Sequence, residues 1–145
     1  MQIQVTDPRL TIEDFKPSTS GSAGIDLHAC MDRHIVLEPN QQVKLDAGFK
    51  IAINSGWVGI ILPRSGLGSK GLVLGNTAGV IDSDYRGPVG LVLLNRGKDN
   101  IMIDPYMRVA QLLIVPCYAH MAMEVGTEDL PVTKRGTDGW GSTGN

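Results

Sequence analysis

Cysteine, aromatic residues and long apolar stretches are all scarce in this sequence. Its 2 cysteines, Cys30 and Cys117, are too few for a disulfide framework or a cysteine-rich zinc site. No apolar run approaches the roughly 20 residues that span a bilayer, and residues 1–10 lack the apolar core of a signal peptide. We therefore expect a cytoplasmic protein with reduced thiols and no membrane partner.

Neither sign of charge dominates, because 13 Lys and Arg residues face 15 Asp and Glu residues and the net charge is -2. Binding of long nucleic acid through overall charge is therefore not expected. A small anionic ligand remains possible, since it needs only a local cationic cluster. Hydrophobic residues make up 42% of the 145 residues, which suits one domain with a packed core.

Segments long enough for regular helices are also missing, because 18 glycines and 8 prolines interrupt the chain. Short runs of Val, Ile and Leu partly alternate with polar residues at period two, which is typical of β-strands. The predicted strands are residues 35–37, 43–45, 49–53, 58–62, 89–94, 101–103 and 109–116. Closely spaced strands joined by turns predict an all-β sandwich or barrel. One short helix is expected after residues 64–66, with Ser65 as its candidate cap.

Residues 126–145 differ from the rest of the chain in composition. They are polar and glycine-rich, with one large aromatic side chain, Trp140. Such a segment cannot build a core, so we divide the chain into a β-domain at residues 1–125 and a flexible C-terminal arm. Composition alone leaves open whether the arm is a disordered terminus or folds over a ligand or a neighbouring subunit.

Two glycine-rich stretches, residues 66–71 and 139–144, fit the pattern G-x-G-x-x-G. The first is not embedded in a βαβ unit, and the second leaves no residues for the helix that a dinucleotide site requires. Such backbone can still present N–H groups to a phosphate. His28, Cys30 and His34 lack further metal ligands at convincing spacing, so a Cys/His metal site is not expected.

Three polar clusters are candidates for a site, and each also has an ordinary structural interpretation. Asp82 and Asp84 would share one face if they lay on a strand, and they form either a solvated acidic turn or a site where a carboxylate deprotonates a water. Arg64 could bind a phosphate or stand at the start of a capped helix. Arg108 and Gln111 lie in an apolar strand, where backbone carbonyls could satisfy both side chains.

Each cluster is weak alone, but five segments occur together in a fixed order. They are A-G-I-D-L at 23–27, P-R-S-G-L at 63–67, G-V-I-D-S-D-Y-R-G at 79–87, R-V-A-Q at 108–111 and R-G-T-D-G-W-G-S-T-G at 135–144. In order and spacing they resemble the five motifs of the homotrimeric dUTP diphosphatases (dUTPases). The resemblance covers nearly the whole chain.

This resemblance implies a jelly-roll β fold and a homotrimer with active sites at the subunit interfaces. It implies Mg²⁺-dependent hydrolysis of dUTP to dUMP and pyrophosphate. Such an enzyme keeps uracil out of DNA and supplies dUMP for thymidylate synthesis.

The resemblance also gives catalytic roles to Asp82 and Gln111. Asp82 would be the general base that orients a water for in-line attack on the α-phosphorus. Gln111 would help to hold the phosphate and that water. Asp26 would act on Mg²⁺ through the metal's waters, because the substrate phosphates supply most of the ligands.

Substrate-binding roles follow in the same way. Tyr85 would pack against the deoxyribose and leave no space for a 2′-hydroxyl. Asn76, with the backbone of a hairpin at about residues 76–90, would read the uracil edge, and Arg64 would contact the phosphates across a subunit boundary. The full expected set outside the arm is Arg64, Ser65, Gly66, Asn76, Gly79, Val80, Ile81, Asp82, Tyr85 and Gly90.

The arm resembles a lid that orders on the substrate. Arg135, Ser142 and Thr143 would contact the γ-phosphate. Trp140 stands where the family usually has Phe and would stack over the uracil. Gly141, the next residue, would also bind the substrate.

Two alternatives come from other functional classes. A dCTP deaminase of the same superfamily would place a catalytic Glu at the position of Arg86, and a guanidinium cannot take a proton. A non-catalytic member that only binds a partner protein is the other alternative. The intact Asp82, Tyr85 and Arg135 argue against it.

Overall fold

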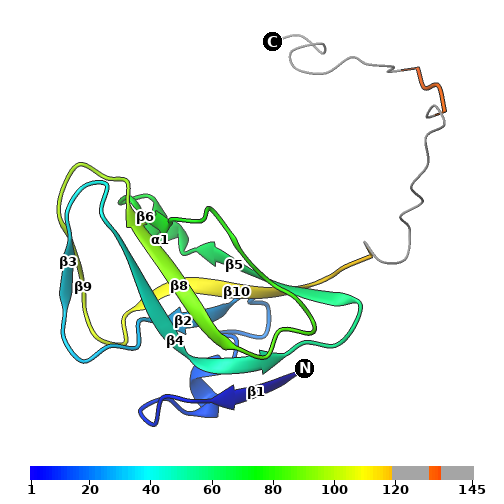
Figure 1. Cartoon of the computed structure of the whole chain (residues 1–145), viewed down its shortest axis with the longest axis horizontal. Helices are drawn as coiled ribbons and strands as arrows, with labels where there is room; N and C mark the ends of the chain where they lie inside the picture. Colours follow the sequence, from blue (N-terminus) through cyan, green and yellow to red (C-terminus); the bar gives the residue numbers. More distant parts are fainter. Residues whose placement is uncertain (119–130, 135–145) are drawn as a thin grey trace.

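The computed structural model describes residues 1–118 and 131–134. In chain order its elements are β1 (Gln2–Val5), the 3-10 turn η1 (Ile12–Phe15), β2 (Ile25–His28), β3 (Ile35–Leu37), β4 (Gln42–Ala52), β5 (Trp57–Pro63), α1 (Ser65–Gly68), β6 (Leu72–Leu74), β7 (Gly79–Ile81), β8 (Pro88–Asn95), β9 (Ile101–Ile103) and β10 (Arg108–Pro116). Figure 1 shows this arrangement. The all-β prediction with one short helix is therefore confirmed for the described residues.

Two four-stranded antiparallel sheets make up most of the fold. One has the strand order β1-β4-β8-β6 and the other has the order β2-β10-β5-β7, while β3 and β9 form a separate pair. The last strand of the described residues, β10, runs through the second sheet between β2 and β5. Strands that are distant in sequence therefore lie side by side, which brings the predicted site segments together.

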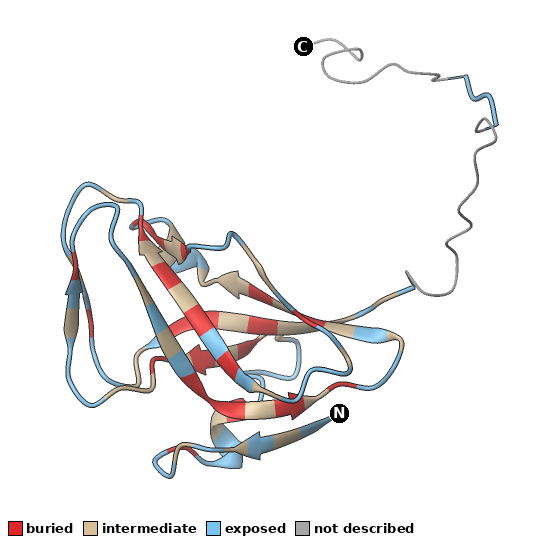
Figure 2. Ribbon diagram, in the orientation of Figure 1, coloured by how far each residue is buried: buried red, intermediate tan, exposed pale blue. Residues whose placement is uncertain are grey.

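The core lies where the two sheets contribute alternate side chains to one apolar cluster. Along β8, Val89, Leu91 and Leu93 are buried while the residues between them are more exposed. Along β2, Ile25 and Leu27 are buried and the intervening polar residues are only half-buried. Figure 2 shows this alternation along the strands. Because side chains alternate at period two, a strand that packs the core must present its polar residues on the opposite face.

The predicted strand boundaries differ from the structure mainly at β4. The sequence predicts two strands there, at 43–45 and 49–53, but one strand runs through both. The alternation breaks because Ala47, Gly48 and Phe49 are buried in succession, at a point where the pairing with β8 shifts register. Gly48 has φ +77°, as expected where a glycine permits a bulge.

The short strands β1, β2, β6 and β7 were not predicted. Each has only three or four residues. Their pairing with longer neighbours creates them. Within residues 1–118 and 131–134, no helix is both long and apolar enough to cross a membrane.

Candidate functional site

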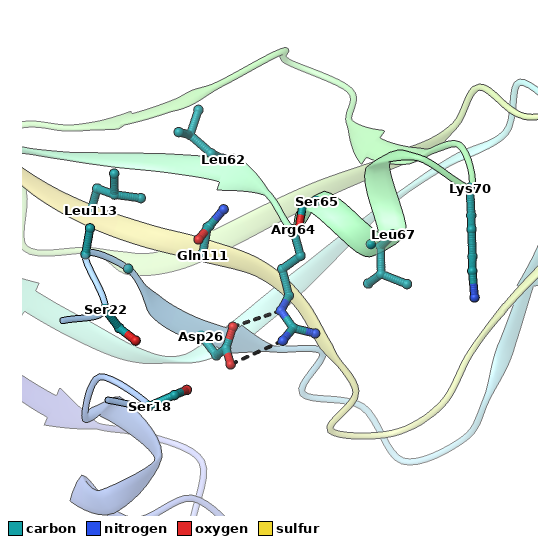
Figure 3. Close-up of a pocket in the computed structure, with 13 residues that line it drawn as sticks. Ser18, Ser22, Asp26, Leu62, Arg64, Ser65, Leu67, Lys70, Gln111 and Leu113 are labelled. Carbon is teal, nitrogen blue, oxygen red and sulfur yellow. Dashed lines mark hydrogen bonds and ion pairs between the residues drawn. The ribbon is translucent and has the colours of Figure 1, made fainter. Parts of the chain in front are cut away.

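A polar cavity of about 630 Å³ lies over the β2-β10-β5 part of the second sheet. Gln111 on β10 pairs in register with Asp26 on β2 and with Leu62 on β5, so these three side chains share one face of the sheet. Figure 3 shows the cavity. The residues that line it are Ser18, Ser22, Ala23, Gly24, Asp26, Leu62, Arg64, Ser65, Gly66, Leu67, Lys70, Gln111 and Leu113. Five of the residues predicted for the site thus lie together here.

Asp26, which lines this first cavity, forms ion pairs with two arginines, Arg64 in the lining and Arg108 outside it. Arg64 Nε lies 2.8 Å from Asp26 Oδ1 (Figure 3), and Arg108 Nη1 lies 3.2 Å from Asp26 Oδ2. The Asp26 side chain is 19% exposed, against 33% for Arg64 and 55% for Arg108. One carboxylate faces two guanidinium groups, so the cluster keeps an excess positive charge that can attract an anion.

Arg108 is one residue of the site that the sequence prediction missed. Its guanidinium was expected to be satisfied by backbone carbonyls, but it is exposed and pairs with Asp26 instead. Its own carbonyl accepts a hydrogen bond from Arg64 Nη1 at 3.3 Å. The signal was the position of Arg108 at the start of the R-V-A-Q segment, but only the register between β10 and β2 places it beside Asp26.

Gln111 connects β10 to the end of β5. Its Nε2 donates a hydrogen bond to the carbonyl of Pro63 at 3.0 Å, which confirms the expected backbone partner. A Cβ at Gly24 would lie 2.8 Å from Gln111 Oε1, so the glycine leaves space for the amide. Since Pro63 immediately precedes Arg64, this bond fixes the end of β5 where the Arg64 side chain departs.

The expected cap of the short helix was wrong. Helix α1 begins at Ser65, its N-cap residue is Arg64, and no side chain forms a capping hydrogen bond. Ser65 and Gly66 line the first cavity instead. Lys70, just beyond the helix, also lines it and adds a further cationic side chain that the prediction did not include.

A half-buried histidine lies next to this cluster. His28 pairs in register with Arg108, and its Nδ1 is buried without a hydrogen-bond partner in the described part of the chain. Burial lowers the pKa of His28 below its ordinary value and outweighs the opposing effect of Asp14 and Asp26. The imidazole is therefore neutral at pH 7.

A second, smaller cavity of about 210 Å³ contains the other predicted residues of the described chain. Asp82 and Tyr85 are exposed at its surface. The lining consists of Ile61, Asn76, Gly79, Val80, Ile81, Asp82, Tyr85, Pro88, Val89 and Gly90. All seven predicted residues between positions 76 and 90 thus lie around one cavity.

Two details of this segment differ from the expectation. Strand β7 ends at Ile81, so Asp82 and Asp84 lie in a turn rather than on a strand. The expected hairpin is also wrong in its pairing, because β7 pairs with β5 while β8 pairs with β4 and β6. The segment therefore crosses from one sheet to the other, and the cavity lies at that crossing.

The single chain does not bring all predicted residues into one place. Among the described residues, the two cavities share no lining residue. Arg64 and Gln111 therefore belong to one cavity and Asp82 to the other. The arm residues Arg135, Trp140, Gly141, Ser142 and Thr143 lie outside the described residues.

Fold and cavities together define an all-β protein with an arginine-lined polar cavity on one sheet. The dUTPase family model matches residues 11–144, so the chain belongs to the dUTPase family.

Two curated relatives carry the name deoxyuridine 5′-triphosphate nucleotidohydrolase. The protein of Methylibium petroleiphilum is 44% identical over 146 residues, covering 99% of this chain and 97% of the relative. The protein of Acinetobacter baumannii is 45% identical over 148 residues with the same coverage. The solved structure of a Staphylococcus bacteriophage 80alpha dUTPase mutant with dUpNHpp superposes with a TM-score of 0.83 at 24% identity, covering 99% of this chain and 98% of that one. This likeness confirms the predicted jelly-roll-like fold.

Proposed function

We propose that this protein hydrolyses dUTP to dUMP and pyrophosphate. Membership of the dUTPase family supports this activity. The observation that carries it is the second cavity, where Asn76, Asp82 and Tyr85 lie together. Its volume of about 210 Å³ is below the roughly 300–1,000 Å³ of cavities that enclose a whole drug-sized ligand. It therefore suits the base and sugar of a nucleotide, with the phosphates extending outside.

In this proposal the second cavity selects the nucleoside and prepares the water. The amide of Asn76 reads the uracil edge, and the Tyr85 ring packs against the deoxyribose. The Asp82 carboxylate accepts a proton from a water whose oxygen attacks the α-phosphorus. The bond between the α-phosphorus and the bridging oxygen breaks, and pyrophosphate leaves. The exposed position of Asp82 supports this role, because a water can reach it.

The first cavity is the proposed phosphate site. Arg64 and Arg108 share a single carboxylate, so positive charge remains for phosphate oxygens. Ser65 and Gly66 line the rim, where the hydroxyl and backbone N–H groups can donate hydrogen bonds. Gln111 would help to hold the phosphate and the attacking water.

Mg²⁺ is the proposed cofactor, held mainly by the substrate. Among residues 1–118 and 131–134, no group of three or more His, Cys, Asp or Glu side chains could enclose a metal ion. Asp26, with both oxygens already paired to arginines, suits a Mg²⁺ that binds through phosphate oxygens and waters, because its oxygens can accept hydrogen bonds from those waters. Bound there, Mg²⁺ would neutralise charge on the triphosphate.

We further propose a homotrimer in which each active site combines the first cavity of one subunit with the second cavity of another. The separation of the two cavities on one chain supports this arrangement, because phosphate and nucleoside groups must meet at one substrate. Residues 126–145 would form an arm that closes the site, with Arg135, Ser142 and Thr143 on the γ-phosphate and Trp140 and Gly141 over the uracil. A cytoplasmic location, where thiols stay reduced, completes the proposal, and both cysteines are free.

Pyrophosphate release from dUTP and from dCTP, each with Mg²⁺, tests the proposed function. Rapid release from dUTP alone is expected, and ammonia release from dCTP would indicate a deaminase instead. Arg86 stands where a deaminase would have its catalytic Glu, and a guanidinium cannot take a proton; it donates hydrogen bonds to the carbonyls of Ser83 and Tyr85 instead. Absence of turnover with both nucleotides would support a non-catalytic binding protein.

A further inference from the structure

The Tyr85 ring is held against the turn that follows it. Tyr85 Oη donates a hydrogen bond to the carbonyl of Pro88 at 3.0 Å, and the Tyr85 backbone N–H donates to the carbonyl of Asp82 at 3.1 Å. Arg86 Nη1 donates to the carbonyls of Ser83 at 2.7 Å and of Tyr85 at 2.8 Å. The ring therefore has a fixed direction although the residue is 44% exposed.

Gly87 is the residue that leaves room for this ring. A Cβ at Gly87 would lie 2.6 Å from Tyr85 Cζ and 3.0 Å from Cε2, and closer still to Oη. The three nearest atoms are all in the Tyr85 side chain and none is in the backbone. An alanine at this position must therefore displace the ring, whereas the strands on either side can stay in place.

The direction of the ring matters because two cavities meet at this point. Tyr85, Pro88, Val89 and Gly90 line both the second cavity and a neighbouring cavity of about 540 Å³, which also contains Lys44. These four residues thus form a wall that the two cavities share. Displacement of the Tyr85 ring would therefore create space between the two cavities, next to the proposed position of the sugar.

We propose that Gly87 is a positioning residue that sets the preference for deoxyribonucleotides over ribonucleotides. It acts through Tyr85, by allowing the ring to lie where a 2′-hydroxyl would otherwise fit. This inference rests on the proposed function. Loss of the ring contact admits the hydroxyl of UTP, so the substitution changes selectivity more than the rate with dUTP.

The test compares kcat/KM for dUTP and UTP in the full-length protein and in Gly87→Ala. The ratio of the two constants is expected to fall by about tenfold or more, the order that one excluded group contributes to selectivity. Gly21→Ala is the matched control, since no atom lies within 4 Å of its added Cβ, and it should keep the parent ratio.

A double-mutant cycle separates this role from a general structural one. In a Tyr85→Ala background there is no ring to displace, so adding Gly87→Ala should leave the dUTP/UTP ratio unchanged. Equal effects of Gly87→Ala with and without the tyrosine ring would overturn the inference. If Gly87→Ala fails to fold, folding of the double variant would support the contact, and failure of both to fold would refute it.

The outcome is distinguishable from failure of the proposed function. A parent protein that does not hydrolyse dUTP would refute the function itself. A parent that hydrolyses dUTP and rejects UTP, with an unchanged ratio in Gly87→Ala, would refute only the role of Gly87.

Discussion

The guanidinium of Arg64, just after β5, lies against the carboxylate of Asp26 on β2, with Nε 2.8 Å from Oδ1. Arg108 reaches the other carboxylate oxygen from β10. Strands β2 and β10 and the residue that follows β5 therefore contribute to one charged cluster at the proposed phosphate site. The single carboxylate keeps two like charges close together, which would otherwise repel each other.

Asp26→Asn should lower kcat/KM for dUTP by about tenfold and raise the Mg²⁺ concentration needed for half-maximal rate. The amide keeps the shape but no longer balances the two guanidinium charges or accepts hydrogen bonds as strongly from metal-bound waters. Steady-state rates over a Mg²⁺ titration measure both effects. Asp104→Asn, at an exposed position outside both cavities, is the control. An unchanged Mg²⁺ dependence in Asp26→Asn would remove Asp26 from the metal's surroundings.

Asp82→Asn should reduce the rate of dUTP hydrolysis by about 10²–10⁴, the usual contribution of a general base, while dUTP binding stays nearly intact. Asparagine has the same shape but cannot take the proton of the water. Single-turnover rates and equilibrium binding of dUTP measure the two effects separately. Asp84→Asn, in the same turn but outside the cavity lining, should retain turnover. Full activity of Asp82→Asn would exclude it as the base.

Mixing Asp82→Asn subunits with Arg64→Ala subunits should restore part of the activity that each variant lacks. A mixed trimer contains some sites in which the parent Asp82 meets the parent Arg64 from another subunit. Activity after joint refolding, with mass from light scattering, checks this. Each variant refolded alone serves as the control. A monomer with full activity would contradict the shared site.

Removal of residues 135–145 should cut turnover by about 10³–10⁵ if Arg135 acts on the phosphates as an arginine finger does. The β-domain should remain folded, because the described core lies within residues 1–118. Turnover and circular dichroism measure the two outcomes, and removal of Asn145 alone is the control. A truncated protein as fast as the full chain would require withdrawal of the roles given to Arg135, Trp140, Gly141, Ser142 and Thr143.

Asp7→Asn should reduce stability at neutral pH but not at strongly acidic pH. Hydrogen bonds from Arg9, together with one from Tyr106, hold the pKa of Asp7 below its ordinary value of 3.8. A lowered carboxyl pKa stabilises the fold above pH 3.8, and this contribution disappears as the pH falls through the lowered value. The expected loss at pH 7 is about 1–3 kcal/mol, as for a hydrogen bond to a charged group.

Urea unfolding of the parent and of Asp7→Asn between neutral and acidic pH measures this difference. Asp32→Asn is the matched control, because Asp32 pairs with the same Arg9 but its side chain is 82% exposed, and exposed pairs contribute little. A difference between Asp7→Asn and the parent that stays constant down to the lowest pH would show that the charge of Asp7 is not the cause.

Several strands and the motif segments could be predicted from the sequence because both depend on residues that are close together in the chain. Residues 35–37 and 101–103 were predicted as strands with the observed bounds, since β-branched and apolar side chains there favour extended backbone. Asp82, Tyr85 and Asn76 were selected as one group, and the structure places them around one cavity. Residue type and spacing were sufficient for the strands, whereas the site group came from the resemblance of the five segments to the dUTPase motifs.

Tertiary structure decided which distant residues meet. The register between β10 and β2 sets Arg108 beside Asp26, and the pairing of β7 with β5 turns the expected hairpin into a crossing between sheets. The contact between Gly87 and the Tyr85 ring depends on side-chain direction in a turn. The sequence by itself determined the strand-forming segments and the chemistry available, because these depend on near neighbours. Register, sheet membership and the separation of the two cavities depend on packing of the shared core, and that is settled only when the strands assemble.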